Sequence, residues 1–207
     1  YHNLYVADLK VLVDGNAEHE ELNEILGSVS VSSNQMVSNI SLYNFYSRTK
    51  EDNSQFLIKT SKDNGSQSFA VNCVENVNKV VEGNTYSYYK FKQMNGGTSR
   101  SQSFANVSQN FEIVVDYSSI LYTVEFQTVE YVFANSKVTL KEMDGNTLSP
   151  LSKKRNEDVK LDATSVESVE NIGFKFVGFA TQLNGEIVQE INEKIDAAKP
   201  RGMKIYL

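Results

Sequence analysis

The stretch NIGFKFVGFATQLNGEIV, residues 171–188, decides how the C-terminal half of this 207-residue chain folds. Two Gly-aromatic pairs flank a strand-like run, and an Asn-Gly turn follows. Phe174 and Phe176 share one face of a regular strand, whereas Phe179 is offset from that face. Gly178 can supply the bulge or close backbone approach that turns Phe179 inward. We therefore predict that these rings form a core rather than a ligand platform, because large aromatics in alternating strands are usually buried.

The composition of the chain favours strands over helices. Apolar residues make up 40% of it, including 11 Tyr and 11 Phe, which is enough to build a core. Ala and Leu are sparse beside Val, Ser, Thr, Asn, Tyr and Phe, and β-branched and aromatic residues are enriched in strands. The predicted fold is mostly β with two short helices, in the α+β class.

The charge of the chain argues against nucleic-acid binding. The formal net charge is −6, so no domain-wide basic field is present to neutralise a phosphate backbone. The one basic run, Lys153 to Arg155, lies in a polar stretch and is predicted to be a solvated loop. No apolar run is long enough for a membrane-spanning helix, so direct membrane insertion is not expected.

Strongly alternating segments predict where the strands and the module boundary lie. In NFEIVVDY (110–117) and LYTVEFQT (121–128), apolar and polar residues alternate, which marks strands with one wet face. The segment between them, near residues 118–120, is the predicted boundary. We therefore expect two small modules, residues 1–119 and 120–207. A short echo of residues 173–185 in residues 88–97 leaves open that the first module is a diverged repeat of the second.

Two segments carry helix signals. The first, AEHEELNEILGS (17–28), follows a capping Asn16, has acids in its first turn and ends at Gly27. The second is predicted near residues 185–200, because isoleucines recur at every fourth position and Pro200 then ends the segment. Those isoleucines are Ile187, Ile191 and Ile195.

An ordered set of motifs in residues 121–207 resembles a known bacterial family. The set consists of Tyr-Thr-Val-Glu-Phe at 122–126, Gly-Phe-Lys-Phe-Val-Gly-Phe at 173–179, and Lys-Ile-Tyr-Leu at 204–207. It resembles the Listeria–Bacteroides repeat, also called the internalin B-type repeat. The chain departs from the family pattern, since Phe179 stands where the family usually has Trp and the stretch 141–171 is longer than usual. The resemblance is therefore to a divergent member.

The resemblance implies a small β-grasp-like module displayed on large bacterial surface or secreted proteins. Such repeats act as stalks, spacers or partner-binding modules, and the resemblance does not imply catalysis. The core predicted for this module consists of Tyr122, Val124, Phe126, Phe174, Phe176, Phe179 and Ile205.

Candidate catalytic and metal-binding residues are few. The two histidines, His2 and His19, have no Cys or His partner at metal-ligand spacing. The single cysteine, Cys73, alternates with Phe69 and Val71 and is predicted to be a buried small hydrophobe. We therefore expect no enzymatic activity, no cofactor and no metal.

These observations favour a non-catalytic module of a bacterial cell-surface, cell-wall or secreted protein. It would act as a spacer or as an adhesive protein-binding unit, and would be a monomeric piece of a larger chain. Its partners would be a host or cell-surface protein or a glycan, and its location extracellular. The alternative is a carbohydrate-binding domain that uses exposed tyrosines of the N-terminal half, for which Tyr86, Tyr88 and Tyr89 are the candidates.

Overall fold

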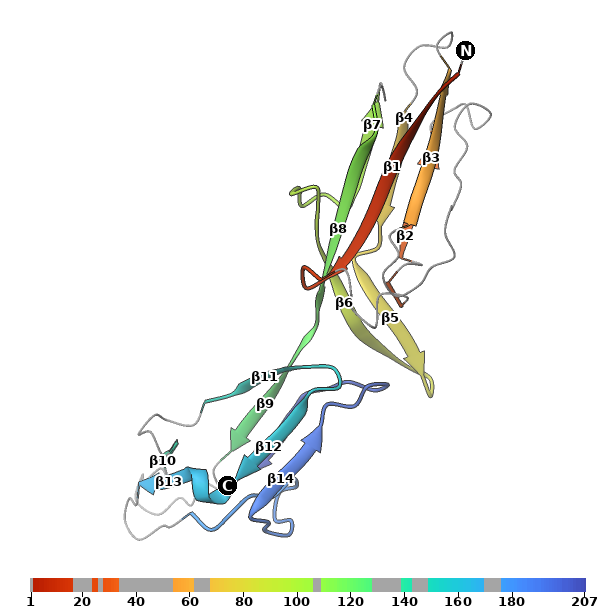
Figure 1. The fold of residues 1–207 in the computed structure, drawn as a ribbon. Helices are drawn as coiled ribbons and strands as arrows, with labels where there is room; N and C mark the ends of the chain where they lie inside the picture. The colour runs from red at the N-terminus through yellow and green to blue at the C-terminus, as the bar shows by residue number, and fades with distance from the viewer. Residues whose placement is uncertain are drawn as a thin grey trace. The chain divides into compact units, whose positions relative to one another are not determined.

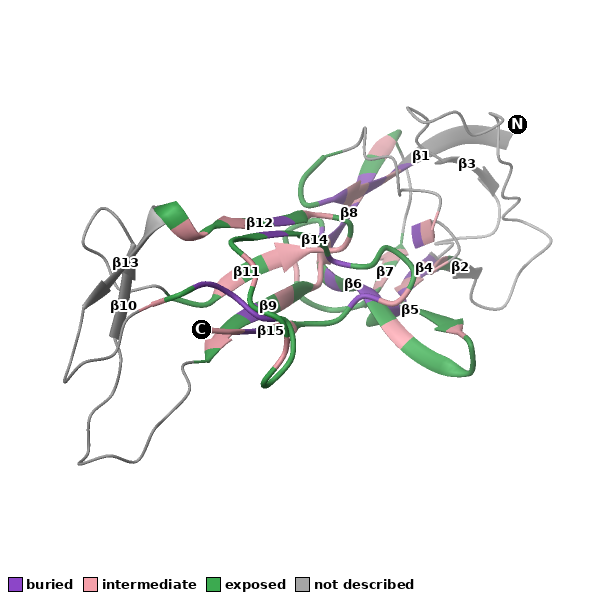
Figure 2. Cartoon of the chain, turned by 90° about the horizontal axis from the view of Figure 1, so that it is seen from below, coloured by how far each residue is buried: buried purple, intermediate pink, exposed green. Residues whose placement is uncertain are grey.

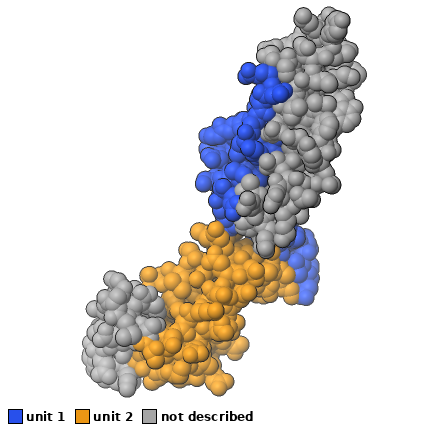
Figure 3. All heavy atoms as spheres, viewed as in Figure 1, with its two compact units in different colours: residues 1–119 blue, residues 120–207 orange. Residues whose placement is uncertain are grey.

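The structure is a computed structural model that describes residues 2–16, 24–25, 28–33, 54–61, 68–105, 109–127, 139–142, 149–169 and 176–207. The chain divides into two compact units, Tyr1–Ser119 and Ile120–Leu207, which Figure 3 colours separately. The described residues are mostly in strands, so the predicted β character is confirmed.

The described strands of unit 1 form two sheets, one mixed and one antiparallel (Figure 1). The larger sheet has the strand order β3-β1-β8-β6-β5, in which β1 and β8 are parallel and the other neighbours are antiparallel. The smaller is antiparallel with the order β2-β4-β7. The strands are β1 (His2–Val13), β2 (Val29–Ser33), β3 (Ser54–Ser61), β4 (Ser68–Cys73), β5 (Asn76–Val81), β6 (Asn84–Met94), β7 (Ser101–Ala105) and β8 (Phe111–Ser119).

The core of unit 1 lies between these two sheets. Ile113, Val115 and Tyr117 alternate along β8, and each is at most 2% exposed. Phe69 and Val71 of β4 belong to the same buried cluster. Burial therefore follows the period-2 pattern that predicted the strands, except at Asp116, which is 4% exposed and accepts a hydrogen bond from the backbone N–H of Gly15 (3.1 Å). Figure 2 shows the buried residues in purple along β6 and β8.

Three two-residue turns of the mirror-image type lie in the described part of unit 1, and one of them, Glu82-Gly83, connects β5 with β6. The pairs Asp14-Gly15, Glu82-Gly83 and Asn95-Gly96 all have positive φ values, between 47° and 80°. Both central residues of a type I′ turn need positive φ, and this turn matches the right-handed twist of paired strands. Asp14 also accepts hydrogen bonds from the backbone N–H (2.9 Å) and the hydroxyl (2.7 Å) of Ser119 at the end of β8.

Unit 2 is centred on its first strand. β9 pairs antiparallel with β11 and parallel with β15, the last strand of the chain. Two isolated bridges, Ala180–Tyr206 and Phe179–Val188, extend this arrangement beyond β15. β12 pairs with β14, and β10 with β13. The strands are β9 (Leu121–Gln127), β10 (Thr139–Glu142), β11 (Leu151–Lys154), β12 (Asp158–Asp162), β13 (Val166–Val169), β14 (Glu190–Lys194) and β15 (Met203–Tyr206).

The two predicted helices are not confirmed. Of the first, the structure describes Glu24 and Ile25, which are helical; most of that segment lies outside the described residues. The second prediction is wrong, because the segment contains the strand β14. A four-residue spacing places side chains on one face of a strand as well as on one face of a helix. Ile191 and Ile195 are buried on that strand face, whereas Ile187 is 55% exposed.

Candidate functional site

The three tyrosines predicted to bind a partner lie together on β6, but two of them are in the core. Tyr88 is 2% exposed and Tyr89 is 1% exposed. Tyr86 is partly buried against the same cluster. The register between β5 and β6 shifts at this point, so Tyr88 is an extra residue opposite Val77. Such a bulge re-aims side chains and accounts for two successive buried rings. Tyr88 and Tyr89 therefore offer no open ring face to a sugar.

The residues predicted to form the core of unit 2 have the following places in the structure. Val124 and Phe179 are fully buried, and Ile205 is 1% exposed. Tyr122, Phe126 and Phe176 are partly buried and pack against that cluster. Phe174 lies outside the described residues.

Phe179 and Val188 close a hairpin whose base is anchored in this core. The N–H of Phe179 donates to the carbonyl of Val188 (2.8 Å), and the N–H of Val188 donates back (2.7 Å). Ala180 and Tyr206 of β15 exchange two such bonds, each of 2.8 Å. Phe176 packs edge-to-face on Phe179, with ring centroids 5.3 Å apart. The loop between Phe179 and Val188 is therefore held at its base by the core of unit 2.

Gly178 allows the chain to enter this hairpin. Its φ is +148°, a conformation that side-chain-bearing residues rarely adopt. A Cβ atom at this position would lie 2.7 Å from the side chain of Ile187 and 2.7 Å from the carbonyl oxygen of Val188. The side-chain amide of Gln189 also donates to the carbonyl of Val177 (2.7 Å). The glycine is thus required by both backbone conformation and close approach.

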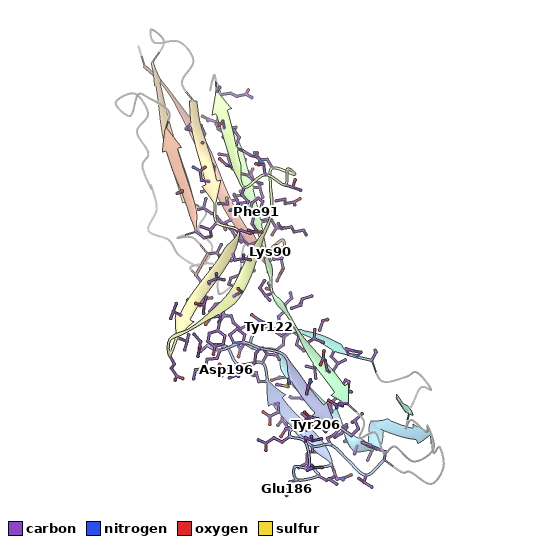
Figure 4. All side chains as sticks on the ribbon, turned by 180° about the vertical axis from the view of Figure 1, so that it is seen from behind. Lys90, Phe91, Tyr122, Glu186, Asp196 and Tyr206 are labelled. Carbon is purple, nitrogen blue, oxygen red and sulfur yellow. The ribbon has the colours of Figure 1, made fainter. Side chains whose placement is uncertain are left out.

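A groove of about 390 Å³ lies between this hairpin loop and β14. The loop turns at Asn184, whose φ is +58°, and Gly185 donates a backbone hydrogen bond to Gln182. Figure 4 labels Glu186 on the loop and Tyr206 on β15, which anchors its base. The groove is lined by Thr181, Gln182, Gly185, Glu186, Val188, Glu190, Ile191, Asn192 and Glu193.

The lining of the groove is acidic. It contains three glutamates, Glu186, Glu190 and Glu193, and no lysine, arginine or histidine. None of the ion pairs formed within the described part of the chain involves these glutamates. The nearest lysine along β14, Lys194, is 3.8 Å from the carboxylate of Asp158. The groove thus has a local negative charge that a basic ligand would complement.

Exposed apolar side chains occur on this hairpin, at Leu183 and Ile187, and at Val177 just before it. Val177, Leu183 and Ile187 are 56%, 59% and 55% exposed. Large apolar side chains that are more than half exposed are candidates for contact with a partner. The hairpin therefore combines a hydrogen-bonded base, an acidic groove and exposed apolar side chains whose contact with water is unfavourable.

Two aspartates, Asp162 at the end of β12 and Asp196 just after β14, stabilise turns. Asp162 accepts hydrogen bonds from the backbone N–H (2.9 Å) and hydroxyl (2.8 Å) of Thr164, and these bonds lower its pKa. The backbone N–H groups of Lys199 and Ala198 likewise lower the pKa of Asp196. Carboxyl groups with lowered pKa values stay ionised at neutral pH, so neither is suited to donate a proton.

Cys73 in unit 1 has the environment of an unreactive thiol. Its side chain is 6% exposed, and burial raises its pKa to about 11. Tyr117 is fully buried beside it and donates a hydrogen bond to the carbonyl of Val74 (2.8 Å). Burial also raises the pKa of Tyr117 to about 12. A nucleophilic cysteine needs the opposite shift, toward the thiolate.

The raised pKa values of Cys73 and Tyr117 predict a loss of stability at alkaline pH. Because burial raises both pKa values above the ordinary 9.0 of a thiol and 10.0 of a phenol, the stabilisation is complete below pH 9 and is lost as pH rises toward 12. A shift of two units corresponds to about 3 kcal/mol at most. Urea unfolding at pH 8 and pH 11 measures how far the free energy of unfolding falls between these two pH values. We expect this fall to be smaller in Cys73→Val than in the wild type, by up to that amount. Identical pH dependences for the variant and the wild type would contradict this assignment.

The described residues contain no group of three or more His, Cys, Asp or Glu side chains that could hold a metal ion. His19 is outside the described residues, and the side chain of His2 is not described. No described helix is long and apolar enough to cross a membrane.

The helix predicted for residues 185–200 excludes the groove, so this prediction missed it. A strand there places Glu190 and Glu193 beside the loop that carries Glu186. The available signal was the Asn184-Gly185 turn between Phe179 and Val188, which is typical of a hairpin connection. That signal would have favoured a strand after the turn.

Comparisons with known proteins do not assign the chain to a family. No family model matches it, and no curated protein does. Among solved structures, one similar chain is a candidate cell adhesion protein from Bacteroides thetaiotaomicron VPI-5482. The match covers 99% of this chain and 93% of that one, with 6% identity and a TM-score of 0.19. A likeness at that score carries no argument about fold or function.

Proposed function

We propose that this chain is an adhesive, protein-binding module of a bacterial cell-surface or secreted protein. The observation that supports this most is the hairpin of unit 2, where exposed Leu183 and Ile187 lie on the loop that borders the acidic groove. Water contact with such apolar side chains is unfavourable, and a partner that covers them gains the free energy of their burial.

The resemblance to the internalin B-type repeat supports the same proposal. The first and last strands of unit 2, β9 and β15, are parallel neighbours, as in β-grasp folds. Phe179, at the position of the family's usual Trp, is fully buried. On this proposal unit 2 is a divergent, β-grasp-like repeat, and the chain is one non-catalytic piece of a larger extracellular protein. It would act without cofactor, metal or nucleic acid and without inserting into a membrane.

Protein and glycan arrays, which include extracellular-matrix and bacterial surface proteins, test the proposal. We expect the full chain to bind a protein, and Leu183→Ser combined with Ile187→Ser to weaken that binding about tenfold or more, since truncating interface anchors costs above 1 kcal/mol each. Val80→Ser is the matched control, because Val80 is 70% exposed on β5 of unit 1.

The other possible functions give different results in the same arrays. A spacer binds nothing, so a clean null on both arrays would contradict the proposal. Glycan binding that disappears in Tyr86→Ala, but not in the Leu183/Ile187 variant, would instead support the carbohydrate-binding alternative. Tyr86 is the probe because its ring is the one partly exposed member of the three tyrosines.

A further inference from the structure

β14 has one hydrogen-bonded edge and one open edge in the described part of the chain. Its register with β12 pairs Asp162 with Glu190 and Asp158 with Lys194 (Figure 1). Just beyond each end of the ladder, the N–H of Ala163 donates to Gln189 (2.8 Å) and the N–H of Ile195 donates to Glu157 (3.0 Å).

These two bonds fix which backbone groups of β14 point toward β12. In an antiparallel pair, residues alternate between those that bond to the partner strand and those whose N–H and C=O point away. Gln189 and Ile195 bond toward β12. Ile191 and Glu193 lie an even number of residues from them, so their N–H and C=O groups also point toward β12. The N–H and C=O groups of Glu190, Asn192 and Lys194 therefore point to the open edge. No described strand pairs with that edge, and no described backbone group bonds to it.

The open edge and the groove belong to the same surface. Glu190, Ile191, Asn192 and Glu193 are consecutive residues of β14, and all four line the groove. A chain that pairs with this edge would satisfy the outward backbone groups and place side chains beside Glu190 on one face of β14 and beside Glu193 on the other. Opposite charges on neighbouring strands are favourable, and like charges are unfavourable.

We infer that β14 accepts an extended, lysine- or arginine-bearing segment of a partner protein as an added strand. In this binding mode, main-chain hydrogen bonds supply affinity and side-chain contacts supply specificity. The charge of the groove selects a basic segment. The inference rests on the proposed protein-binding function and names the chemistry of the partner. A second copy of this chain is a poorer occupant, because each copy has a formal net charge of −6.

The first experiment measures the binding of a synthetic peptide to the full chain. The probe is an acetylated, amidated heptapeptide, Lys-Val-Lys-Thr-Lys-Val-Lys, and the control replaces each Lys with Glu. Calorimetry is expected to detect the basic peptide, with affinity that falls as salt rises, and not the acidic one. In NMR spectra the amide signals of Glu190, Asn192 and Lys194 should shift most. Equal binding of both peptides, or shifts away from β14, would overturn the inference.

N-methylation of the peptide separates strand addition from simple charge attraction. Alternate amides of an added strand bond to β14, so methylating one alternate set should weaken binding about tenfold or more, and methylating the other set about threefold or less. Equal affinities of both methylated peptides would show that no strand is added.

Protein variants provide the matching test on the other side of the interface. Asn192→Pro removes an outward N–H that β12 does not use, whereas Asn192→Ala keeps it; we expect the proline variant alone to lose the peptide. Glu193→Gln should weaken binding about two- to fivefold, as expected for an exposed charge pair. Glu82→Gln, on the β5–β6 turn of unit 1, is the charge control and should not weaken it.

The peptide result and the array result are separable. A protein partner that depends on Leu183 and Ile187, together with no binding of the basic peptide, would refute strand addition and leave the proposed function standing. Failure of both would refute both. Sedimentation that shows a concentration-dependent dimer, abolished by Asn192→Pro, would identify a second copy as the occupant and would also overturn the inference.

Discussion

Replacing Phe179 with alanine is expected to lower the free energy of unfolding of unit 2 by about 3–5 kcal/mol, the range for a fully buried Phe. The ring is 0% exposed and belongs to the same cluster as Val124, Ile191 and Ile205. The substitution removes the burial of the ring and leaves a cavity that its neighbours fill only in part. Urea unfolding of the full chain, followed through the NMR amide signals of unit 2, measures the loss.

Leu183→Ala is the matched control for Phe179→Ala. Leu183 lies on the same hairpin but is 59% exposed, so its truncation should change stability by less than about 0.5 kcal/mol. If the two substitutions cost the same, Phe179 is not a core residue, and the assignment of the core in unit 2 fails.

Gly178→Ala is expected to destabilise unit 2 by about 3 kcal/mol, because two costs add. An L-residue at φ +148° is strained, and the new Cβ would lie 2.7 Å from a backbone oxygen that is held in the hairpin. The carbonyl of Val188 cannot retreat without breaking its hydrogen bond with Phe179 (2.8 Å). Thermal unfolding and the amide signals of Phe179 and Val188 report the effect.

Gly83→Ala separates the two costs. Gly83 also has a positive φ, +80°, but a Cβ there meets no atom within 4 Å. It should cost only the backbone term, about 1–2 kcal/mol. A cost for Gly178→Ala no larger than that of Gly83→Ala would show that Gly178 is needed only for its backbone conformation and not for close approach.

Sequence patterns predicted the alternating strands well where burial is mainly on one face. Ile113, Val115 and Tyr117 of β8 are buried at a period of two, and Asp116, which is 4% exposed, is the exception on the other face. The residue pairs at the Asp14-Gly15 and Asn95-Gly96 turns also carry a local signal, since few residue pairs accept two positive φ values in succession.

The segment after Phe179 could not be predicted from the spacing of its isoleucines. Positions four apart share a face in both a helix and a strand, so Ile187, Ile191 and Ile195 fit either structure. Tertiary contacts decided between them, because Ile191 pairs with Leu161 across the β12–β14 ladder. The groove depends on that pairing, which positions β14, so it could not be predicted from the local sequence.

The tyrosines illustrate a second limit. A run of aromatics on one strand indicates neither which face is wet nor where a bulge occurs. The shift in register at Val77 places Tyr88 and Tyr89 in the core together, and no local sequence signal marks that shift. Only the structure shows that the rings of Tyr88 and Tyr89 are buried.

One hairpin of unit 2 both completes the core and lines the groove. Native-state hydrogen exchange tests it most directly. We predict that the amides of Phe179 and Val188, which bond to each other at 2.8 and 2.7 Å, exchange only when unit 2 unfolds, whereas those of Leu183 and Ile187 exchange with little protection. Exchange of Phe179 and Val188 as fast as that of Leu183 would contradict the account, because the loop would then have no anchored base.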